Sequence, residues 1–567
     1  MKRALLIACT TFLALEATAQ SKFQSIKDDN NVTDLTLDSL EKAATARPIA
    51  GSSRKGQNPV LFLVGNSTMR TGTLGNGNNG QWGWGFYAQN YFDKEKITVE
   101  NHALGGTSSR TFYNRLWQDV TKGIRPGDYV IVELGHNDNG PFDSGRARAS
   151  IKGISPTDSL CVTIQETGQR ETVYSYGEYL RRFVRETRAL GAHPILMSLT
   201  PRNAYAQVSS QDAPSARRVA RVDRSFGLWA RQIAEELDCA FVDLNEISAA
   251  KFDEMSEWKF NYHFYLDHIH TSAFGAQLNA RSACDGLLAC AHPEVQALKT
   301  MMTNTQLPTT GVKRTAGKPV LFITGDSTVK NEDRDEDGMW GWGSQAATVF
   351  DESKITIMNC AQAGRSCRSY LREGRWDKVC NDLQPGDYVL IQFGHNDAGN
   401  ELAHGKARND IMGTADSSHV YRVNTGSEVR HEVVYTFGWY LRKMIDDTRQ
   451  KGATPILVSL TPRNEWTFTP ARGRGRMSKK GKAQQHIERR NESFGRWYRE
   501  VVEQTGVALL DLHNISADAF DKLGREKTQE YFKRDHTHTS LKGARLNAQS
   551  IRQGLKKMKS PLAKYLL

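Results

Sequence analysis

The sequence contains no long apolar run after its first twenty residues, and cysteine is scarce. A transmembrane helix needs roughly 20 mostly apolar residues, so we predict no membrane span beyond that point. The 8 cysteines include no paired Cys-x-x-Cys motifs, which argues against a structural zinc site. The net charge is +12, but the basic residues are spread along the chain and form no recognised nucleic-acid-binding motif. We therefore expect no structural zinc site and no nucleic-acid partner.

One segment, 472–490, is densely basic. We interpret it as a solvated loop that leads into a helix. If it binds a partner, an acidic polysaccharide fits its charge as well as a nucleic acid does.

The first nineteen residues have the pattern of an export signal. A short basic start precedes the apolar stretch 4–15, and Ala-Thr-Ala follows as a cleavage site. The residues up to Cys9 also resemble a lipoprotein box, but the apolar stretch before this cysteine is too short for a signal core. We predict a signal peptide over 1–19, export to the periplasm or the extracellular space without a lipid anchor, and a polar leader segment over 20–57.

The two halves of the chain repeat each other. A chain of 567 residues is too long for one ordinary core, and its halves match in order at offsets of 258 to 268 residues. This period indicates duplication of a whole domain, because solenoid repeats are far shorter. We predict domains over 58–300 and 317–567, joined by a linker at 301–316. The matched pairs are VLFLVGNST (60–68) with VLFITGDST (320–328), QWGWG (81–85) with MWGWG (339–343), NHALGGTSSRTF (101–112) with NCAQAGRSCRSY (359–370), RPGDYVIVELGHND (125–138) with QPGDYVLIQFGHND (384–397), HPILMSLTPRN (193–203) with TPILVSLTPRN (454–464), and DHIHTS (267–272) with DHTHTS (535–540).

Short apolar runs alternate with amphipathic segments within each copy. In the first copy the amphipathic segments include 179–190 and 226–237. Continuous apolar runs are typical of strands buried on both faces, and their alternation with helices indicates parallel βαβ units. The sequence therefore predicts an α/β sandwich that binds ligands beyond the carboxyl ends of its strands. The apolar runs of the first copy are 60–64, 97–99, 129–134, 195–199 and 241–244.

Two serines follow the first predicted strand of each copy. Ser67 comes after a Gly-Asn turn and Ser327 after a Gly-Asp turn. A serine on such a tight turn can be exposed and approached closely, because glycine permits the turn. A helix cap is the alternative role, and it is common for serine.

Two asparagines follow the third predicted strand of each copy, in the matched sequence Gly-His-Asn-Asp. Asn137 and Asn396 can donate their side-chain amides to an oxyanion, together with backbone N–H groups of Gly106 and Gly364. Ordinary turn chemistry is the alternative for these positions. The preceding histidines, at 136 and 395, are interpreted as structural.

The motif Asp-His-x-His near the end of each copy is the most specific indication of a catalytic site. Asp267 and His270, like Asp535 and His538, are three residues apart, so both side chains can lie on one face of a turn or helix start. The carboxylate can then hold one imidazole nitrogen and direct the other toward a serine. A metal site is the alternative, because two histidines and an aspartate can also bind a metal ion.

These blocks together resemble the SGNH (GDSL-like) hydrolase superfamily, and are most similar to rhamnogalacturonan acetylesterases, over nearly all of 58–290 and 317–560. The resemblance implies two tandem flavodoxin-like three-layer α/β/α domains, each with a five-stranded parallel sheet. It implies a serine nucleophile, an aspartate-oriented histidine base, and an oxyanion hole from Gly, Asn and the N–H of the serine, without a metal or an organic cofactor. The implied sites are Ser67, Gly106, Asn137, Asp267 and His270 in the first copy, and Ser327, Gly364, Asn396, Asp535 and His538 in the second.

The first copy departs from the family pattern at two positions. Asn66 stands where the second copy has Asp326, and Thr107 stands where it has Arg365. Neither change removes a group of the implied mechanism, so we expect both sites to work, with a possible difference in rate or substrate.

The expected reaction is removal of acetyl groups from an acidic plant-wall polysaccharide such as rhamnogalacturonan or pectin. A general lipase or arylesterase is one alternative, and one active copy beside a carbohydrate-binding copy is another. Arg202 and Arg463 are candidates for contacts with a uronate carboxylate. Tryptophans 82, 84, 340 and 342 could stack on sugar rings, although helix packing explains them equally well.

Overall fold

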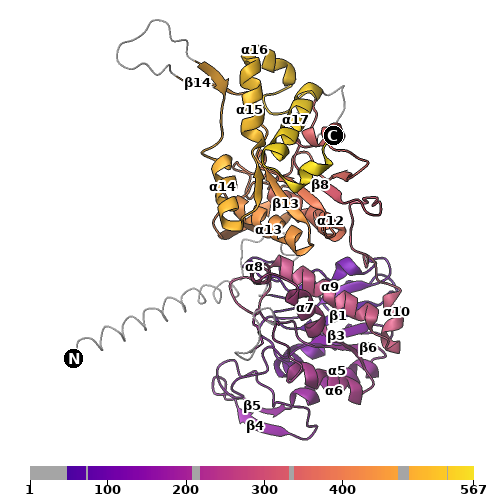
Figure 1. Cartoon of the computed structure of the whole chain (residues 1–567). Coiled ribbons are helices and arrows are strands. Elements are labelled where there is room, and N and C mark those ends of the chain that lie inside the picture. Colours follow the sequence, from indigo (N-terminus) through magenta and orange to yellow (C-terminus); the bar gives the residue numbers. More distant parts are fainter. Residues whose placement is uncertain (1–46, 72–73, 207–217, 331–337, 470–483, 533) are drawn as a thin grey trace, which may run out of the picture. The chain divides into compact units, whose positions relative to one another are not determined.

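Figure 1 shows the computed structural model, which describes residues 47–71, 74–206, 218–330, 338–469, 484–532 and 534–567. The predicted signal peptide, most of the leader segment and most of the basic segment 472–490 lie outside the described residues. The chain divides between Gln306 and Leu307 into two compact units, except that Val429–Glu432 group with the first. No helix of the described residues is both long and apolar enough to cross a membrane.

The first unit is built on a five-stranded sheet with the strand order β2-β1-β3-β6-β7. All neighbouring strands pair in parallel. Numbered along the chain within this sheet, the order is 2-1-3-4-5, which is the flavodoxin-like order. The strands are β1 (Val60–Gly65), β2 (Thr98–Asn101), β3 (Tyr129–Glu133), β6 (His193–Met197) and β7 (Ala240–Val242).

Side chains of β1 alternate between two cores, one on each face of the sheet. Val60, Phe62 and Val64 belong to one core, and Leu61 and Leu63 belong to the other. A strand covered on both faces needs apolar residues at every position, which is why the runs in the sequence do not alternate with polar residues. The helices on the first face are α3 (Ser109–Phe112), η3 (Tyr113–Trp117), α4 (Gln118–Thr121), α5 (Tyr176–Ala189) and α6 (Phe226–Glu236). The helices on the second face are η1 (Trp84–Phe86), η2 (Ala88–Tyr91), α7 (Leu244–Asp253), α9 (Ala273–Ala289), η5 (Pro293–Val295) and α10 (Gln296–Lys299). Helix α8 (Glu257–Tyr262) precedes α9 in the chain.

The second unit repeats this architecture with the strand order β16-β13-β10-β8-β9, again parallel throughout. The prediction of two tandem α/β domains with five-stranded parallel sheets is therefore confirmed. The strands are β8 (Val320–Gly325), β9 (Thr356–Asn359), β10 (Tyr388–Gln392), β13 (Thr454–Val458) and β16 (Ala508–Leu510); the helices are η6 (Trp342–Thr348), α11 (Cys367–Arg372), α12 (Arg375–Asp382), α13 (Phe437–Gln450), α14 (Phe494–Thr505), α15 (Leu512–Leu523), α16 (Arg525–Thr528), η7 (Gln529–Tyr531), α17 (Leu541–Lys557) and η8 (Pro561–Tyr565).

Each unit also carries an antiparallel hairpin that the apolar pattern did not predict. In the first unit β4 (Ser159–Thr163) pairs with β5 (Arg170–Tyr174), and in the second β11 (Ser418–Asn424) pairs with β12 (Val429–Tyr435). Most side chains of β4 are exposed, so this strand has no apolar run that could mark it in the sequence. A further pair in the second unit joins β14 (Trp466–Thr469) to β15 (Gln484–Ile487).

Residues near the predicted domain boundaries contact the sheet beside them. Arg54 forms an ion pair with the buried Asp128 at 2.6 Å, and Arg314 pairs with Asp387 in the same way in the second unit. Each aspartate also accepts a hydrogen bond from the first backbone N–H of strand β1 or β8. At the start of the predicted linker, Met302 packs against the core of the first unit.

Candidate active site

The nucleophile candidates lie on turns at the carboxyl ends of β1 and β8. The backbone carbonyl oxygen of Asn66 accepts hydrogen bonds from the N–H groups of Met69 and Arg70, so the chain turns directly after the strand. Only 9% of Ser67 and 7% of Ser327 is exposed, so each serine is largely enclosed.

In the first unit the serine, histidine and aspartate form one chain of hydrogen bonds. The Nε2 atom of His270 lies 2.8 Å from Oγ of Ser67, and its Nδ1 atom lies 2.6 Å from Oδ2 of Asp267. Asp267 also accepts backbone N–H bonds from residues 269 and 270 and a side-chain bond from Gln81 at 3.0 Å. Burial opposes ionisation of Asp267, but these hydrogen bonds, with His270 first, lower its pKa. The aspartate therefore stays ionised and fixes the imidazole.

The second unit contains the same arrangement. Ser327 Oγ lies 2.8 Å from Nε2 of His538, and Nδ1 of that histidine lies 2.7 Å from Asp535. Burial opposes ionisation of Asp535 as well, and the bonds from His538 and the backbone lower its pKa. Met339 stands where the first unit has Gln81, so Asp535 has no matching side-chain amide, and its side chain is 40% exposed against 16% for Asp267.

The two asparagines lie beside these serines, each after the third strand of its sheet. The Nδ2 atom of Asn137 donates to the carbonyl oxygen of Thr107 at 2.9 Å, and Nδ2 of Asn396 donates to that of Arg365 at 3.2 Å. A side-chain amide has two N–H donors. One donor thus orients the amide, and the other remains for a ligand.

The matching glycines adopt a backbone conformation that other residues rarely reach, with φ +82° at Gly106 and +77° at Gly364. Their carbonyl oxygens accept hydrogen bonds from Arg148 at 3.1 Å and from Arg408 at 3.3 Å. Arg408 also donates to Oδ1 of Asn396 at 2.8 Å, so Nδ2 of that amide points away from Arg408. These arginines were not among the predicted site residues. The matched sequences GRARAS and GKARND contain them, but a single repeated arginine does not reveal its contact with a distant glycine.

A buried network under the first serine explains the departure at Asn66. The Oδ1 atom of Asn66 accepts a bond from the Thr68 hydroxyl at 3.0 Å, and this hydroxyl also lies 3.0 Å from the carboxyl group of Glu133. Trp84 donates to the same carboxyl group at 3.3 Å. Glu133 is fully buried, and burial raises its pKa to about 7.

The second unit has the same network with carboxyl and amide exchanged. Asp326 accepts from the Thr328 hydroxyl at 2.8 Å, and Gln392 bridges that hydroxyl to the Trp342 indole at 3.0 and 2.7 Å. Each network thus contains one carboxyl group, on the serine turn in the second unit and on β3 in the first. Burial raises the pKa of Asp326 as well.

The histidines before the two asparagines are buried. Burial lowers the pKa of His136 to about 3 and that of His395 well below its usual range, so both are neutral at physiological pH. Their Nε2 atoms face the hydroxyl groups of Thr200 and Thr461. Each histidine is thus buried and lies within hydrogen-bond distance of a threonine that follows a neighbouring strand, β6 or β13.

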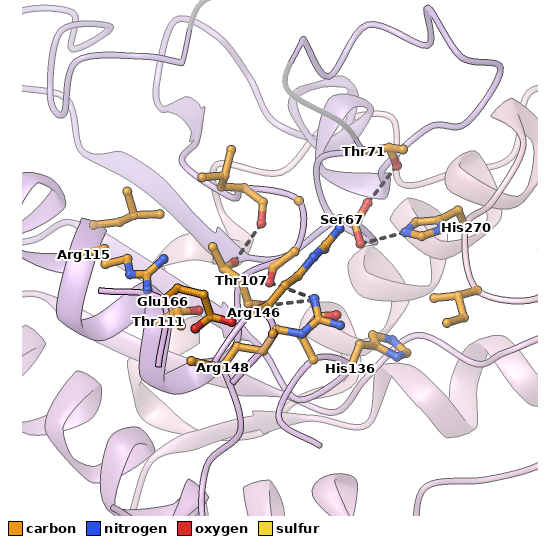
Figure 2. Close-up of a pocket in the computed structure, with 18 of the residues that line it drawn as sticks. Ser67, Thr71, Thr107, Thr111, Arg115, His136, Arg146, Arg148, Glu166 and His270 are labelled. Carbon is orange, nitrogen blue, oxygen red and sulfur yellow. Dashed lines mark hydrogen bonds between the residues drawn. The ribbon is translucent and has the colours of Figure 1, made fainter. Parts of the chain in front are cut away.

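A cleft of about 870 Å³ opens beside the first serine. Its wall contains the whole predicted site of the first unit, together with three arginines at 115, 146 and 148 and with Glu166 (Figure 2). Arg202, a candidate for uronate contact, does not line this cleft. Trp84 and Trp342 are buried in the cores and bonded to β3 and β10, so helix packing and the buried networks account for them.

The described residues contain one group with spacing suitable for a metal ion, formed by Cys367, Asp397 and Asp410. This group is buried behind Asn396 and does not include the Asp-His-x-His motif. In the first unit the aspartate at the matching position, Asp138, instead accepts bonds from two serine hydroxyl groups.

Comparison with known proteins places most of the chain in one family. The model of the GDSL-like lipase/acylhydrolase family matches residues 63–278 and 323–546. A rhamnogalacturonan acetylesterase of Emericella nidulans is 32% identical over 237 residues, covering 41% of this chain and 82% of that protein. The rhamnogalacturonan acetylesterase RhgT of Bacillus subtilis is 27% identical, covering 44% of this chain and 95% of that protein. A solved structure, the acetylxylan esterase Axe2 of Geobacillus stearothermophilus, is 23% identical with a TM-score of 0.26, covering 42% and 95% of the two chains.

Proposed function

Because the chain belongs to the GDSL-like lipase/acylhydrolase family and is an enzyme that hydrolyses carboxylic esters, we propose that both of its units remove acetyl groups from an acidic plant-wall polysaccharide of the rhamnogalacturonan type. The observation that carries this proposal is the hydrogen-bonded chain of serine, histidine and aspartate, present in both units. The names of the relatives support acetyl esters of a polysaccharide as the substrate class.

The geometry supports a double-displacement mechanism. In the first unit His270 takes the proton of Ser67 at Nε2 while Oγ attacks the acetyl carbonyl carbon. The developing oxyanion accepts hydrogen bonds from the second N–H of Asn137 and from backbone N–H groups of Gly106 and Ser67. His270 then gives its proton to the departing sugar oxygen.

The acetyl-enzyme is resolved by the same groups. A water molecule loses a proton to His270 and attacks the acetyl carbonyl. The bond to Ser67 then breaks as His270 returns the proton to Oγ, which releases acetate and restores the serine. Asp267 stabilises the imidazolium that forms twice in each cycle. In the second unit the corresponding groups are Ser327, Gly364, Asn396, His538 and Asp535.

Replacement of both nucleophiles tests the reaction. The full chain with Ser67→Ala and Ser327→Ala is expected to lose acetate release from acetylated rhamnogalacturonan by at least about 10³-fold, because the nucleophile is removed from both triads. Acetylated xylan and long-chain esters serve as comparison substrates. Full activity of the double variant, or a preference for long acyl chains in the parent, would contradict the proposal.

Export belongs to the same proposal, since a polysaccharide of the plant wall is met outside the cell. Expression of the full chain in a bacterial host is expected to give a protein in the exported fraction whose first residue is Gln20. Amino-terminal sequencing checks this, and an unprocessed chain retained in the cytoplasm would contradict it.

A further inference from the structure

We propose that the cleft of the first unit contains a carboxylate-binding subsite, formed by Arg115, Arg146 and Arg148, that holds a uronate of the polymer beside the acetyl group under attack. The inference rests on the proposed function, and it adds the residues that select an acidic substrate. It also assigns this selection to the first unit. The second unit has Lys406 at the position of Arg146, but it has Glu373 at that of Arg115, and its Arg408 lies beside Glu401.

The three arginines come from two segments and line one wall of the cleft. Arg115 lies on η3, and Arg146 and Arg148 lie on the loop after β3, facing the same cavity as Ser67 and His270 (Figure 2). Among the described residues that line this cleft, Asp267 and Glu166 are the carboxylates. The lining of this cleft therefore carries an excess of positive charge.

These guanidinium groups have donors available for a ligand. Within the described part of the chain, no carboxylate lies within 4.0 Å of the three arginines, and Arg148 is bonded to the carbonyl oxygen of Gly106. A guanidinium has five N–H donors in a fork that matches a carboxylate. Burial and the neighbouring charge of Arg146 lower the pKa of Arg148. An anion between the two arginines would relieve that repulsion.

The backbone between the two loop arginines is unusual in both units. Ala147 has a φ of +42°, and Ala407, the matching residue, has a φ of +44°. A non-glycine residue rarely adopts this conformation, and its recurrence points to a site where geometry matters. Both alanines are buried, and the turn brings Arg146 and Arg148 to the same cleft.

The second unit differs at the same wall. Counted from the matched helix caps Ser108 and Ser366, Glu373 stands where the first unit has Arg115. Glu373 pairs with Arg365 at 3.0 Å and with Arg375 at 2.6 Å.

Arg408, which matches Arg148, lies 3.4 Å from Glu401 and donates to Asn396. Its charge, like that of Arg365, is therefore already balanced within the unit. A substrate carboxylate is expected to bind more weakly there, because it must compete with carboxylates of the protein for the same arginines.

A matched pair of substrates tests the subsite. The probe is an acetylated oligogalacturonide, and its comparison is the same oligosaccharide with its carboxylates converted to methyl esters. The measured quantity is the ratio of kcat/KM for the acid to kcat/KM for the methyl ester, in the full chain with Ser327→Ala so that the first unit alone reacts. Arg115→Glu and Arg146→Ala are each expected to lower this ratio about tenfold, mainly through KM.

Two further variants fix the sign of the effect. Glu166→Gln removes a repulsive carboxylate and is expected to raise the ratio, whereas Arg170→Ala, on the exposed hairpin outside the cleft, should leave it unchanged. The Ser67→Ala chain, in which the second unit reacts, is expected to show a lower ratio than the Ser327→Ala chain. Raising the salt concentration should reduce the ratio in the Ser327→Ala chain.

The outcomes separate this inference from the proposed function. An unchanged ratio in both arginine variants, with acetate still released, would overturn the subsite and leave the esterase function standing. Absence of acetate release from either oligosaccharide in the Ser327→Ala chain would instead count against the proposed function of the first unit. A similar loss of kcat/KM for the acid and the methyl ester would show that the arginines support the fold and do not bind the carboxylate. This result would also overturn the subsite.

Discussion

Under each nucleophile one carboxyl group and one amide are hydrogen-bonded through a threonine hydroxyl, and their positions are exchanged between the units. In the second unit the direction of the bonds is defined, because Gln392 donates to Thr328 and Thr328 donates to Asp326. A protonated Glu133 would donate to Thr68 in the same direction. The exchange thus preserves the number of buried carboxyl groups and the hydrogen-bond chain beneath the serine turn.

This exchange predicts a rescue. In the Ser327→Ala background, Glu133→Gln leaves the first network with two amides and is expected to lower kcat several-fold, a loss of about 1 kcal/mol for one altered buried hydrogen bond. Adding Asn66→Asp rebuilds the pair found in the second unit and should recover most of that loss. Steady-state acetate release measures both variants. A double variant that is slower than Glu133→Gln alone would rule out the equivalence of the two networks.

The same carboxyl group predicts a pH effect on stability. Burial raises the pKa of Glu133 from 4.5 to about 7, so between these values the folded chain holds a proton that the unfolded chain has lost. Its contribution to the free energy of unfolding is therefore largest below pH 4.5 and declines as the pH rises to about 7. Compared with the parent, Glu133→Gln should be relatively more stable at pH 8 than at pH 5 in urea denaturation. Equal differences at both pH values would contradict this.

At the scale of single elements, the helix that follows each catalytic histidine begins with a serine cap. Ser272 accepts a bond from the N–H of Gly275 at the start of α9 and donates to the carbonyl oxygen of Tyr262 at 2.7 Å. Ser540 caps α17 in the same way. Because each cap lies two residues after a histidine, it ties the position of the imidazole to a long, packed helix.

Loss of this cap predicts a combined effect on stability and rate. Ser272→Ala should lower the free energy of unfolding of the first unit by about 1 kcal/mol, the usual value for a serine cap. In the Ser327→Ala background it should also lower kcat, because His270 loses part of its support. Denaturant unfolding and acetate release measure the two effects, with Ser540→Ala, which leaves the first unit intact, as the control. Equal rates of the Ser272→Ala and Ser540→Ala chains would show that the cap does not support the histidine.

At the scale of the whole molecule, each triad is built from residues of one unit. Ser67 and His270 belong to the first unit, and Ser327 and His538 belong to the second. Neither site therefore needs a side chain of the other to form its hydrogen-bonded chain.

This independence predicts additive rates. On a small acetyl ester at saturating concentration, the rates of the Ser67→Ala chain and of the Ser327→Ala chain should sum to the rate of the parent. A sum well below the parental rate would show that the units depend on each other. Initial-rate measurements at one protein concentration are sufficient for the comparison.

The sequence by itself determined the duplication, the order of strands and helices, and the residue types at both sites. Apolar runs such as 60–64 mark strands buried on both faces, and the matched motifs fall directly after them. These features are local in the chain, so they can be read without a structure. The exposed hairpin β4–β5 lacked such a signal, and it was missed.

Tertiary structure decided which distant residues act on one another. Only folding brings Glu133 under the turn of Ser67, Arg148 to the carbonyl group of Gly106, and Arg115 into the same cleft. These contacts join the ends of different strands, and their sequence separations follow from the lengths of the helices between them, not from any motif. The difference between the two units therefore became visible as exchanged charges around a common site, where the sequence had shown isolated substitutions.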